Sequence, residues 1–247
     1  MTAHAMTKQQ PHTQPYPWFS YHGPYHGDSP FYYNEQDYDW VKTIEDNFET
    51  IRHELFAFLE NRKSTIDPYF NVDLVGGENY WKVGTFYFWG KRNDENCDQV
   101  PELEKILTSI PGFVSAGLSI LEGNTSIKAH QGDTDASIRG HLGLKIPAEL
   151  PDSGFEVGNI QKSWKEGKVF LFSDAQDHRA WNNSSEKRYI LIFDIIRPEF
   201  LDQQEDICKN AHSLIALQQL EYKMPIVKKL PGKFRGLIRR RLKSRLQ

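Results

Sequence analysis

The first regular pattern of apolar residues begins at Trp40 and predicts a helix. Apolar side chains recur there at spacings of four and three residues, which is the period of a helix that buries one side. The residues that keep this period are Trp40, Ile44, Phe48, Ile51, Leu55 and Leu59. The pattern therefore predicts one amphipathic helix across residues 40–59.

Five short segments after this helix have the composition of strands. They are rich in β-branched and aromatic residues, and Gly, Pro, Asn or Asp separate them. In chain order they are GTFYFWG, GFVSAGLSIL, SIRGHLGLKIP, GKVFLF and KRYILIFDIIRP. Many short strands with helices mainly outside them predict a mainly β fold with flanking helices, of the sandwich or jelly-roll type.

The segment SIRGHLGLKI alternates two kinds of side chain. Successive residues of a strand point to opposite faces of its sheet. Ile138, Leu142, Leu144 and Ile146 share one face, and Arg139, His141 and Lys145 share the other. We therefore expect one face in the core and a second face that carries polar chemistry.

A cation stands at the start of the last predicted strand, RYILIF. Arg188 shares a face with Ile190 and Ile192, so its guanidinium would lie at the edge of an apolar surface. A buried charge without a partner is unfavourable, so this guanidinium needs an anion. That anion is either a ligand or, in a purely structural role, the carboxylate of Asp174 or Asp194.

The two ends of the chain differ from its middle. Residues 1–38 show no period, but their many aromatic side chains favour packing against the rest of the protein. Residues 223–247 hold ten Lys or Arg and no acid, and the other residues carry 20 basic against 33 acidic groups. The sequence thus predicts an irregular arm at 1–38, a β domain with flanking helices at 39–222 and a basic tail at 223–247.

The basic tail has a helical period of its own. Phe234, Ile238, Leu242 and Leu246 recur at every fourth residue and would form an apolar stripe on a basic helix. Such a helix either contacts an anionic membrane or a phosphate-bearing partner, or packs against the acidic body of the protein.

Composition narrows the class of protein. A hydrophobic share of 38% with 26% charged residues is typical of a soluble globular chain. The first twenty residues hold no apolar run of the signal-peptide type, and no stretch has the length of a membrane span. Only two cysteines, Cys97 and Cys208, are present, which fits a reducing compartment. We therefore expect a cytoplasmic protein.

Two histidines suggest a metal site. His130 and His178 lie at the ends of strand-like segments, and neutral imidazole is the commonest side-chain ligand for transition metals. On spacing alone, structural hydrogen bonding is the commoner role of such histidines. Other chemistries lack their motifs, because the chain has no Gly-x-Ser-x-Gly elbow and no glycine-rich phosphate loop.

Several separated motifs resemble one family. They are His-x-Gly at residues 130–132, Arg-x-His-Leu-Gly-Leu from Arg139, Gly-Lys-Val at residues 167–169, Asp-x-x-x-His ending at His178, and Arg188 ten residues later. From about residue 40 to Pro198 the chain is similar to the catalytic region of the aspartyl/asparaginyl β-hydroxylase family. The resemblance implies a double-stranded β-helix, the jelly-roll or cupin-like fold, and an oxygenase that depends on Fe(II) and 2-oxoglutarate.

The resemblance implies that His130 and His178 hold the iron. In most of the wider superfamily a carboxylate two residues after the first histidine completes the metal site. Gly132 stands at that position here, as it does in the β-hydroxylase family. Water, a halide or the neighbouring Asp133 would then fill the third position.

The resemblance also assigns the co-substrate site. Arg188 matches the residue that binds the C5 carboxylate of 2-oxoglutarate, and Ser119 and His141 match two further contacts. Arg139 would bind the co-substrate or an acidic group of the substrate. Trp81 would form an aromatic wall.

The implied reaction uses O2, converts 2-oxoglutarate to succinate and CO2, and hydroxylates an unactivated C–H bond. We expect an amino-acid-like, peptidyl or small-metabolite substrate, no nucleic acid and no obligate protein partner. Three alternatives stay open: a halogenase of a small molecule, because Gly132 leaves room for a halide; a hydroxylase of the lipid A type; and a non-catalytic module that binds 2-oxoglutarate.

Overall fold

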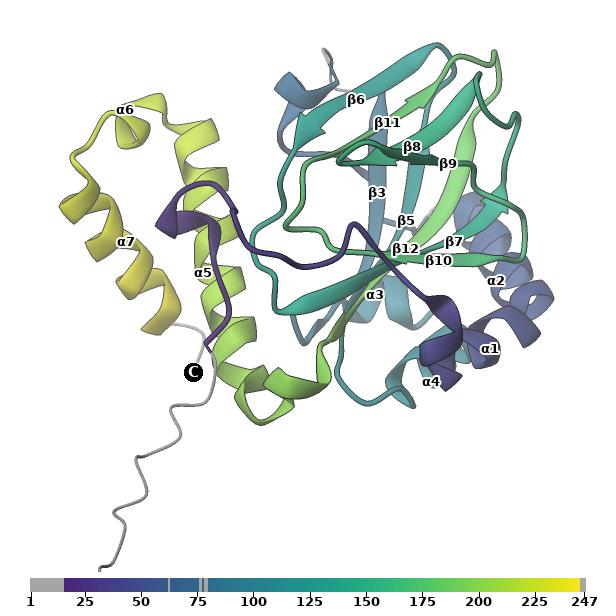
Figure 1. Cartoon of the computed structure of the whole chain (residues 1–247), viewed down its shortest axis with the longest axis horizontal. Helices are drawn as coiled ribbons and strands as arrows, with labels where there is room; N and C mark the ends of the chain where they lie inside the picture. The colour runs from purple at the N-terminus through teal and green to yellow at the C-terminus, as the bar shows by residue number, and fades with distance from the viewer. Residues whose placement is uncertain (1–15, 62, 76, 78–79, 245–247) are drawn as a thin grey trace, which may run out of the picture.

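The strands of the computed structural model form two antiparallel sheets that face each other (Figure 1). The structure describes residues 16–61, 63–75, 77 and 80–244. The larger sheet has the order β1-β10-β7-β12-β5-β3-β2, and β4 pairs with β3. Its strands are β1 (Tyr32–Tyr33), β2 (Asp67–Pro68), β3 (Trp81–Phe88), β4 (Lys91–Arg92), β5 (Phe113–Leu121), β7 (Ser137–Lys145), β10 (Val169–Phe172) and β12 (Arg188–Ile196).

The smaller sheet has the order β6-β11-β8-β9. Its strands are β6 (Thr125–His130), β8 (Ser153–Val157), β9 (Ile160–Lys162) and β11 (His178–Asn182). Neighbouring strands of a sheet are often far apart in sequence, as when β12 lies between β7 and β5. Two facing antiparallel sheets with such crossovers make a jelly roll, so the predicted fold class is confirmed.

Eleven helices flank the sheets in the described part of the chain. The α-helices are α1 (Asp39–Asp46), α2 (Phe48–Glu60), α3 (Asp94–Cys97), α4 (Pro101–Thr108), α5 (Gln204–Lys223), α6 (Pro225–Lys228) and α7 (Gly232–Ser244). The 3-10 helices are η1 (Ser20–His22), η2 (Glu35–Asp37), η3 (Val72–Leu74) and η4 (Pro198–Gln203).

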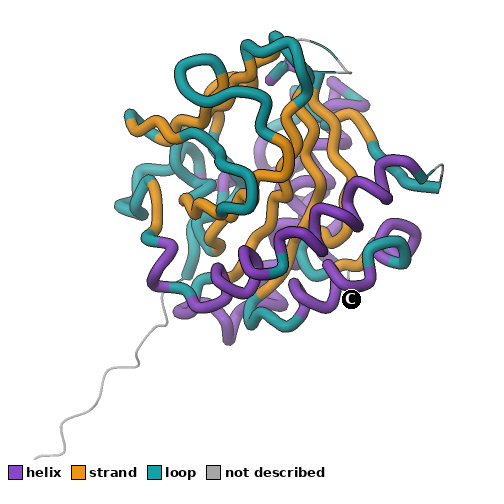
Figure 2. The backbone as a smooth tube through the Cα atoms, turned by 90° about the vertical axis from the view of Figure 1, so that its right-hand side faces the viewer, coloured by secondary structure: helices purple, strands orange, loops and turns teal. Residues whose placement is uncertain are grey.

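Both faces of the larger sheet are covered. Helices α1, α2 and α4 lie against its outer face and share one apolar core with it (Figures 1 and 2). A second, largely aromatic core lies between the two sheets. Central strand β5 is therefore buried along its whole length. Strand β7 keeps the predicted alternation, with Leu142 and Leu144 in the helix-side core and His141 among the aromatic rings of the other. The prediction is wrong for Ile146, which follows the end of β7 and packs against the core between the sheets.

The prediction of a single helix across residues 40–59 is wrong in one respect, because the structure has two helices there. Helix α1 ends at Asp46, and α2 begins at Phe48. Between them, the Asn47 side-chain amide donates to the Thr43 carbonyl at 2.8 Å, and the backbone of Asn47 leaves the helical region. Asparagine side chains compete with the backbone for such bonds, which interrupts the helix while the apolar period continues.

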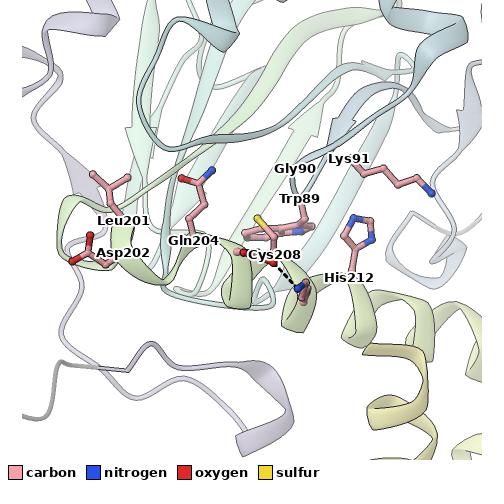
Figure 3. Close-up of a pocket in the computed structure, with 10 residues that line it drawn as sticks. Trp89, Gly90, Lys91, Leu201, Asp202, Gln204, Cys208 and His212 are labelled. Carbon is pink, nitrogen blue, oxygen red and sulfur yellow. Dashed lines mark hydrogen bonds and ion pairs between the residues drawn. The ribbon is translucent and has the colours of Figure 1, made fainter. Parts of the chain in front are cut away.

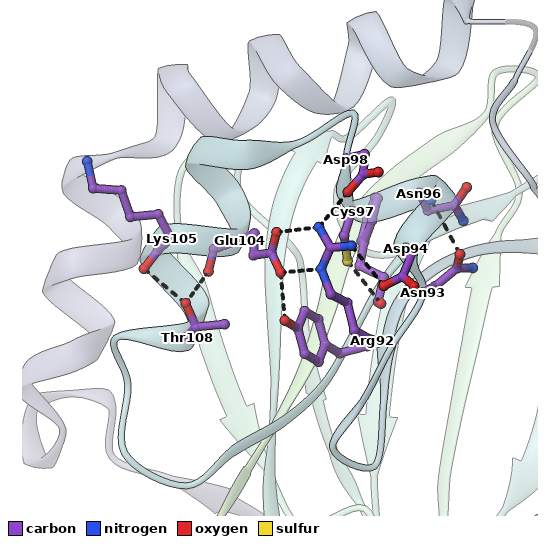
Figure 4. Close-up of polar contacts among 11 residues, drawn as sticks. Arg92, Asn93, Asp94, Asn96, Cys97, Asp98, Glu104, Lys105 and Thr108 are labelled. Atoms are coloured by element: carbon purple, nitrogen blue, oxygen red, sulfur yellow. Dashed lines mark hydrogen bonds and ion pairs between the residues drawn. The ribbon is translucent and has the colours of Figure 1, made fainter.

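A polar cluster joins the β3-β4 hairpin to the helices beside it (Figure 4). The Arg92 guanidinium donates to both oxygens of Glu104 on α4, and also to Asp94 and Asp98. Tyr87 donates its hydroxyl to the same Glu104 at 2.6 Å. The bidentate geometry fixes the hairpin on α4, although exposed ion pairs of this kind stabilise a fold only weakly.

The N-terminal arm packs on the body as the sequence predicts. Phe19 is fully buried in a core shared with α5, and the backbone N–H of Ser20 donates to the Asp133 carbonyl at 2.9 Å. Residues 1–15 of the predicted arm lie outside the described residues. Figure 1 shows the arm running from beside α5 toward α1. The backbone N–H of Tyr25 in the arm donates to the side chain of Gln131, the neighbour of His130, at 2.9 Å.

The basic tail forms the predicted helix, but the predicted apolar stripe is only partly buried against the body of the protein. Helix α7 packs on α5 through Arg235, Arg239 and Lys243, while Phe234 is exposed. Ile238 and Leu242 are half-buried, and Leu246 lies outside the described residues. Cations of α7 therefore face the acidic groups of α5, which matches packing against the acidic body.

Two glycines, one in β7 and one in α7, allow a matched test of how closely the chain packs at each place. A Cβ at Gly143 would overlap the backbone carbonyl oxygen of Lys165, and a Cβ at Gly236 in α7 would meet nothing within 4 Å. We expect Gly143→Ala to lower the free energy of unfolding by about 1–3 kcal/mol through overpacking. Gly236→Ala should raise it by about 0.5–1 kcal/mol, because alanine favours the helix. Urea unfolding measures both changes, and equal effects would contradict the described packing.

Candidate functional site

Two antiparallel neighbours bring His130 and His178 together. Strand β6 ends at His130, strand β11 begins at His178, and the two residues are directly opposite each other in the ladder. Their ring centroids lie 4.2 Å apart. Strand pairing thus brings together two histidines that lie 48 positions apart in the sequence.

Both histidines present the same ring nitrogen. Nδ1 of His130 lies 2.8 Å from the Lys128 carbonyl oxygen, and Nδ1 of His178 lies 2.8 Å from that of Gln176. A carbonyl only accepts hydrogen bonds, so Nδ1 carries the proton and Nε2 keeps its lone pair. Burial lowers the pKa of both imidazoles, and the proximity of His130 lowers that of His178 further. The pair is therefore neutral and suited to bind a metal ion.

Asp174 occupies the space beside Gly132. The Gly132 N–H donates to the Asp174 carbonyl at 2.7 Å, and a Cβ at Gly132 would overlap the Asp174 carboxylate. One oxygen of this carboxylate lies 3.6 Å from Nε2 of His178. A neutral Nε2 and a carboxylate oxygen are both acceptors, so a cation between them would satisfy both. Sequence reasoning did not assign Asp174 to the site, although its position four residues before His178 was visible.

The described residues do not form a complete metal cluster by themselves. No group of three or more His, Cys, Asp or Glu side chains in the described part of the chain is arranged to hold a metal ion. Two histidines with a nearby carboxylate are what the chain supplies. Such a donor set fits a first-row metal that takes further ligands from solvent or a co-substrate.

Arg139 is the counter-ion of two buried carboxylates. It donates from Nη1 to Asp174 at 2.5 Å and from Nε and Nη2 to Asp194 at 2.8 and 3.0 Å. Although burial opposes the charge, both carboxylates raise the pKa of Arg139. The guanidinium thereby orients Asp174 beside His178, a role that the sequence reading did not assign to it.

Arg188 is buried without a carboxylate. Its side chain is 1% exposed, and Nη2 donates to Ser119 Oγ at 3.2 Å. The guanidinium carbon lies 4.6 Å from the ring centroid of Trp164, a residue to which sequence reasoning assigned no role. Trp81 Nε1 donates to the same Ser119 Oγ at 3.0 Å, and Trp81 stacks on Tyr69. Strand pairing between β3, β5 and β12 therefore unites Trp81, Ser119 and Arg188.

The hydrogen bonds of Arg188 are incomplete. Its Nε is buried without a partner, and no Asp or Glu forms an ion pair with it among the described residues. Burial lowers its pKa to about 9, at which the guanidinium is still charged at neutral pH. A buried, charged fork with free donor capacity fits a carboxylate ligand in a planar, bidentate mode.

His141 lies between the histidine pair and Arg188. Its ring contacts Phe155 and Phe172, with centroid distances of 5.0 and 4.9 Å, and Phe172 in turn lies 5.4 Å from His178. Trp164 Nε1 donates to Nδ1 of His141 at 3.3 Å, so this nitrogen is an acceptor. Burial and then the charge of Arg188 lower the pKa of His141 well below its usual value. The histidine pair and Arg188 thus border one continuous aromatic interior.

Asp133 is tied to the arm and to α5. One oxygen of its carboxylate accepts from Ser20 Oγ at 3.0 Å and from Gln218 Nε2 at 2.7 Å, and burial raises its pKa. The carboxylate that lies near Nε2 of His178 is that of Asp174. Asp133 therefore anchors the arm next to the site.

A separate open groove lies between the β3-β4 turn and α5 (Figure 3). It has a volume of about 690 Å³, and Trp89, Cys208 and His212 are among its lining residues. None of the seven candidate residues predicted from the sequence lines it. The candidate site is thus distinct from this groove.

The fold and the site define a jelly-roll protein with two facing histidines and a buried arginine that pairs with no carboxylate among the described residues. The aspartyl/asparaginyl beta-hydroxylase family matches residues 45–198. That match covers more than half of the chain, so the chain belongs to this family, as its motifs predict.

Two curated relatives are each similar to about two thirds of the chain. An ornithine lipid ester-linked acyl 2-hydroxylase of Rhizobium tropici is 29% identical over 174 residues, which cover 69% of this chain and 62% of the relative. The aspartyl/asparaginyl beta-hydroxylase of Homo sapiens is 31% identical over 169 residues, which cover 66% of this chain and 22% of that protein. Among solved structures, a Pseudomonas putida prolyl-4-hydroxylase covers 64% of this chain at 12% identity, with a TM-score of 0.43.

The structure also bears on membrane insertion. Within the described residues, no helix combines the length and the apolar character that crossing a bilayer requires.

Proposed function

We propose that the chain is an oxygenase that uses Fe(II), 2-oxoglutarate and O2 to hydroxylate an unactivated C–H bond. The observation that carries this proposal is the buried Arg188 guanidinium, which has free donor capacity and shares an aromatic interior with two neutral histidines. A dicarboxylate co-substrate that binds the metal at one end and a cation at the other fits both features. Family membership supports the same assignment.

In this proposal the chain holds 2-oxoglutarate by its C5 carboxylate. Arg188 binds that carboxylate with its planar fork, and Ser119 fixes the fork through its hydrogen bond to Nη2. Trp81 fixes the serine in turn. Trp164 covers one face of the guanidinium, and His141 holds Trp164 through its indole N–H. These side chains exclude water from the charged pair, which strengthens the attraction between them.

Nε2 of His130 and of His178 would coordinate the iron. When bound there, iron activates O2 for the oxidative decarboxylation of 2-oxoglutarate and for C–H hydroxylation. The two backbone carbonyls keep both imidazoles in the required tautomer. Arg139 holds Asp174 so that its carboxylate lies beside Gly132 and His178, where it accepts a hydrogen bond from a water molecule or attracts the cation.

The proposed substrate is an acyl or amino-acid-like group in a peptide, a lipid or a small metabolite. The names of the two relatives span this range, since one acts on an ester-linked acyl chain of a lipid and the other on aspartyl and asparaginyl residues. Each relative is longer than the region it shares with this chain, so their substrates are candidates for it rather than assignments.

Succinate formation tests the proposal directly. Purified protein with Fe(II), O2 and labelled 2-oxoglutarate should release labelled succinate, and a correct substrate should increase its rate. A panel of acylated amino acids, ornithine lipids and Asp-containing peptides identifies the substrate by a mass gain of one oxygen atom. Binding of 2-oxoglutarate without succinate release under any of these conditions would favour the non-catalytic module instead.

The position of Asp174 favours hydroxylation over halogenation in this proposal. The room that Gly132 leaves is filled by a carboxylate, which repels a halide ion. We therefore expect that the product gains oxygen and no chlorine or bromine in high chloride or bromide, as measured by mass spectrometry. A halogenated product from the unaltered chain would overturn this expectation.

A further inference from the structure

Exposed apolar side chains gather at one end of the molecule. Among the described residues, eleven large apolar side chains are exposed, and six of them lie between residues 222 and 237. They are Tyr222, Met224, Ile226, Leu230, Phe234 and Leu237. The segment holds the end of α5, all of α6 and the first part of α7, which lie together at the end of the molecule opposite α1 and α2 (Figure 1).

The same segment carries cations that face solvent. Arg235 pairs with Glu221, Lys243 pairs with Asp206, and Arg239 lies 3.8 Å from the centroid of the Tyr21 ring. Six further cations are exposed and form no ion pair with any described residue. They are Lys223, Lys228, Lys229, Lys233, Arg240 and Arg241. The acidic and aromatic side chains of α5 and the arm thus pair with cations on the inner face of α7. The cations on its outer face stay without a partner among the described residues.

The outer face of α7 carries both apolar and cationic side chains. Leu237 lies opposite the face that contacts α5, with Phe234 and Lys233 one turn before it and Arg240 and Arg241 one turn after it. No acidic residue occurs from residue 222 to the end of the chain. An apolar centre flanked by cations is the pattern of a helix that lies in a membrane interface.

We propose that the outer surface of residues 222–241 docks on an anionic lipid bilayer. The cations meet lipid phosphates, while Ile226, Phe234 and Leu237 enter the boundary between headgroups and acyl chains. A nucleic acid or a soluble phosphate would satisfy the cations but would leave the exposed apolar side chains in water. The lipid surface is the partner that satisfies both.

This docking surface is independent of the proposed catalytic site. None of its residues contacts His130, His178 or Arg188 through any hydrogen bond or ion pair among the described residues. Its test measures lipid binding and not turnover, so the two proposals fail separately.

Vesicle sedimentation with the full chain tests the proposal. We expect the protein to pellet with phosphatidylglycerol-containing vesicles, to stay in the supernatant with phosphatidylcholine vesicles, and to bind less as salt concentration rises. Lys228→Glu, Lys229→Glu and Lys233→Glu in one chain should weaken partitioning by about 100-fold or more. Phe234→Ser with Leu237→Ser should weaken it by roughly tenfold or more, with all cations retained.

Matched controls lie elsewhere on the surface. Ile160 is 47% exposed on β9, and Lys165 is exposed in the loop that follows it. Ile160→Ser and Lys165→Glu should leave vesicle binding unchanged. Circular dichroism and thermal unfolding establish that each variant is folded.

Two results would overturn the docking surface. One is equal sedimentation with anionic and neutral vesicles. The other is loss of binding in the charge variant but none in the Phe234 and Leu237 variant, together with equally tight binding of a DNA duplex, which would mark a general polyanion site instead.

Discussion

Arg188→Met is expected to remove 2-oxoglutarate binding while leaving the fold intact or more stable. Loss of a buried, charge-assisted pair costs about 2–5 kcal/mol, so the dissociation constant for 2-oxoglutarate should rise by about 30-fold or more. Without the co-substrate, the wild-type guanidinium is buried with no carboxylate partner. Methionine of similar length removes that desolvation cost, and replacing a buried ion in this way is often neutral or stabilising.

Thermal shift and calorimetry measure both effects on the same samples. The wild-type chain should gain thermal stability when 2-oxoglutarate is added, and the variant should gain none. Arg188→Lys keeps the charge without the fork and should fall between them. A variant that binds 2-oxoglutarate as well as the wild type does would remove Arg188 from the proposed site.

Arg139→Met is the matched control, because Arg139 is the other arginine of the site interior. Asp174 and Asp194 are nearly fully buried, and Arg139 is the cation that neutralises both. Removing it leaves two buried carboxylates without a counter-ion, which is expected to cost about 3–5 kcal/mol of unfolding free energy. In urea unfolding, Arg139→Met should therefore lower the free energy of unfolding, while Arg188→Met should leave it unchanged or raise it. A similar loss in both variants would contradict the contacts described.

His178→Ala is expected to abolish succinate formation. The alanine leaves a single imidazole in place of the facing pair. Because position 178 is buried, we do not expect a water molecule to replace the lost imidazole as a metal ligand. Changes to residues that only support a metal ligand commonly cost 10–100-fold, and loss of the ligand itself should exceed about 100-fold. The bound iron per chain, measured under anaerobic conditions, should fall with the activity.

His212→Ala serves as the control for this change. His212 is half-buried, lines the separate groove beside α5 and contacts Phe88. We expect its succinate formation and iron content to stay at the wild-type level. If His212→Ala lost iron as His178→Ala does, the loss would reflect a damaged fold, and the pairing of His130 with His178 would no longer explain it.

The helix at residues 40–59 shows where sequence patterns stop short. Its apolar period is correct over the whole range, because α1 and α2 both face the same core. The break at Asn47 depends on one side-chain bond to the Thr43 carbonyl, which competes with helix continuation. A periodicity of apolar residues carries no information about such a bond.

The buried ion pairs show a similar division. The sequence left Asp174 or Asp194 as a structural partner for Arg188, and Asp194 lies on the same predicted strand as Arg188. Six residues of strand separate them, a rise of about 20 Å, so no contact is possible along the strand. Asp194 lies directly opposite Arg139 in the β12-β7 ladder instead. Register between strands is a long-range property, and the structure assigns this carboxylate to Arg139.

The sequence by itself determined the alternation of the strands, the spacing of the histidine and arginine motifs, and the family, because these depend on residue type and local period. Only the tertiary structure decided that Arg188 has no carboxylate partner among the described residues while Arg139 has two, and that Asp174 fills the space beside Gly132. It also decided that Arg235 and Lys243 of α7 face α5. Each of these depends on which strands and helices become neighbours, and the pairing of distant segments is set by the packing of the whole chain.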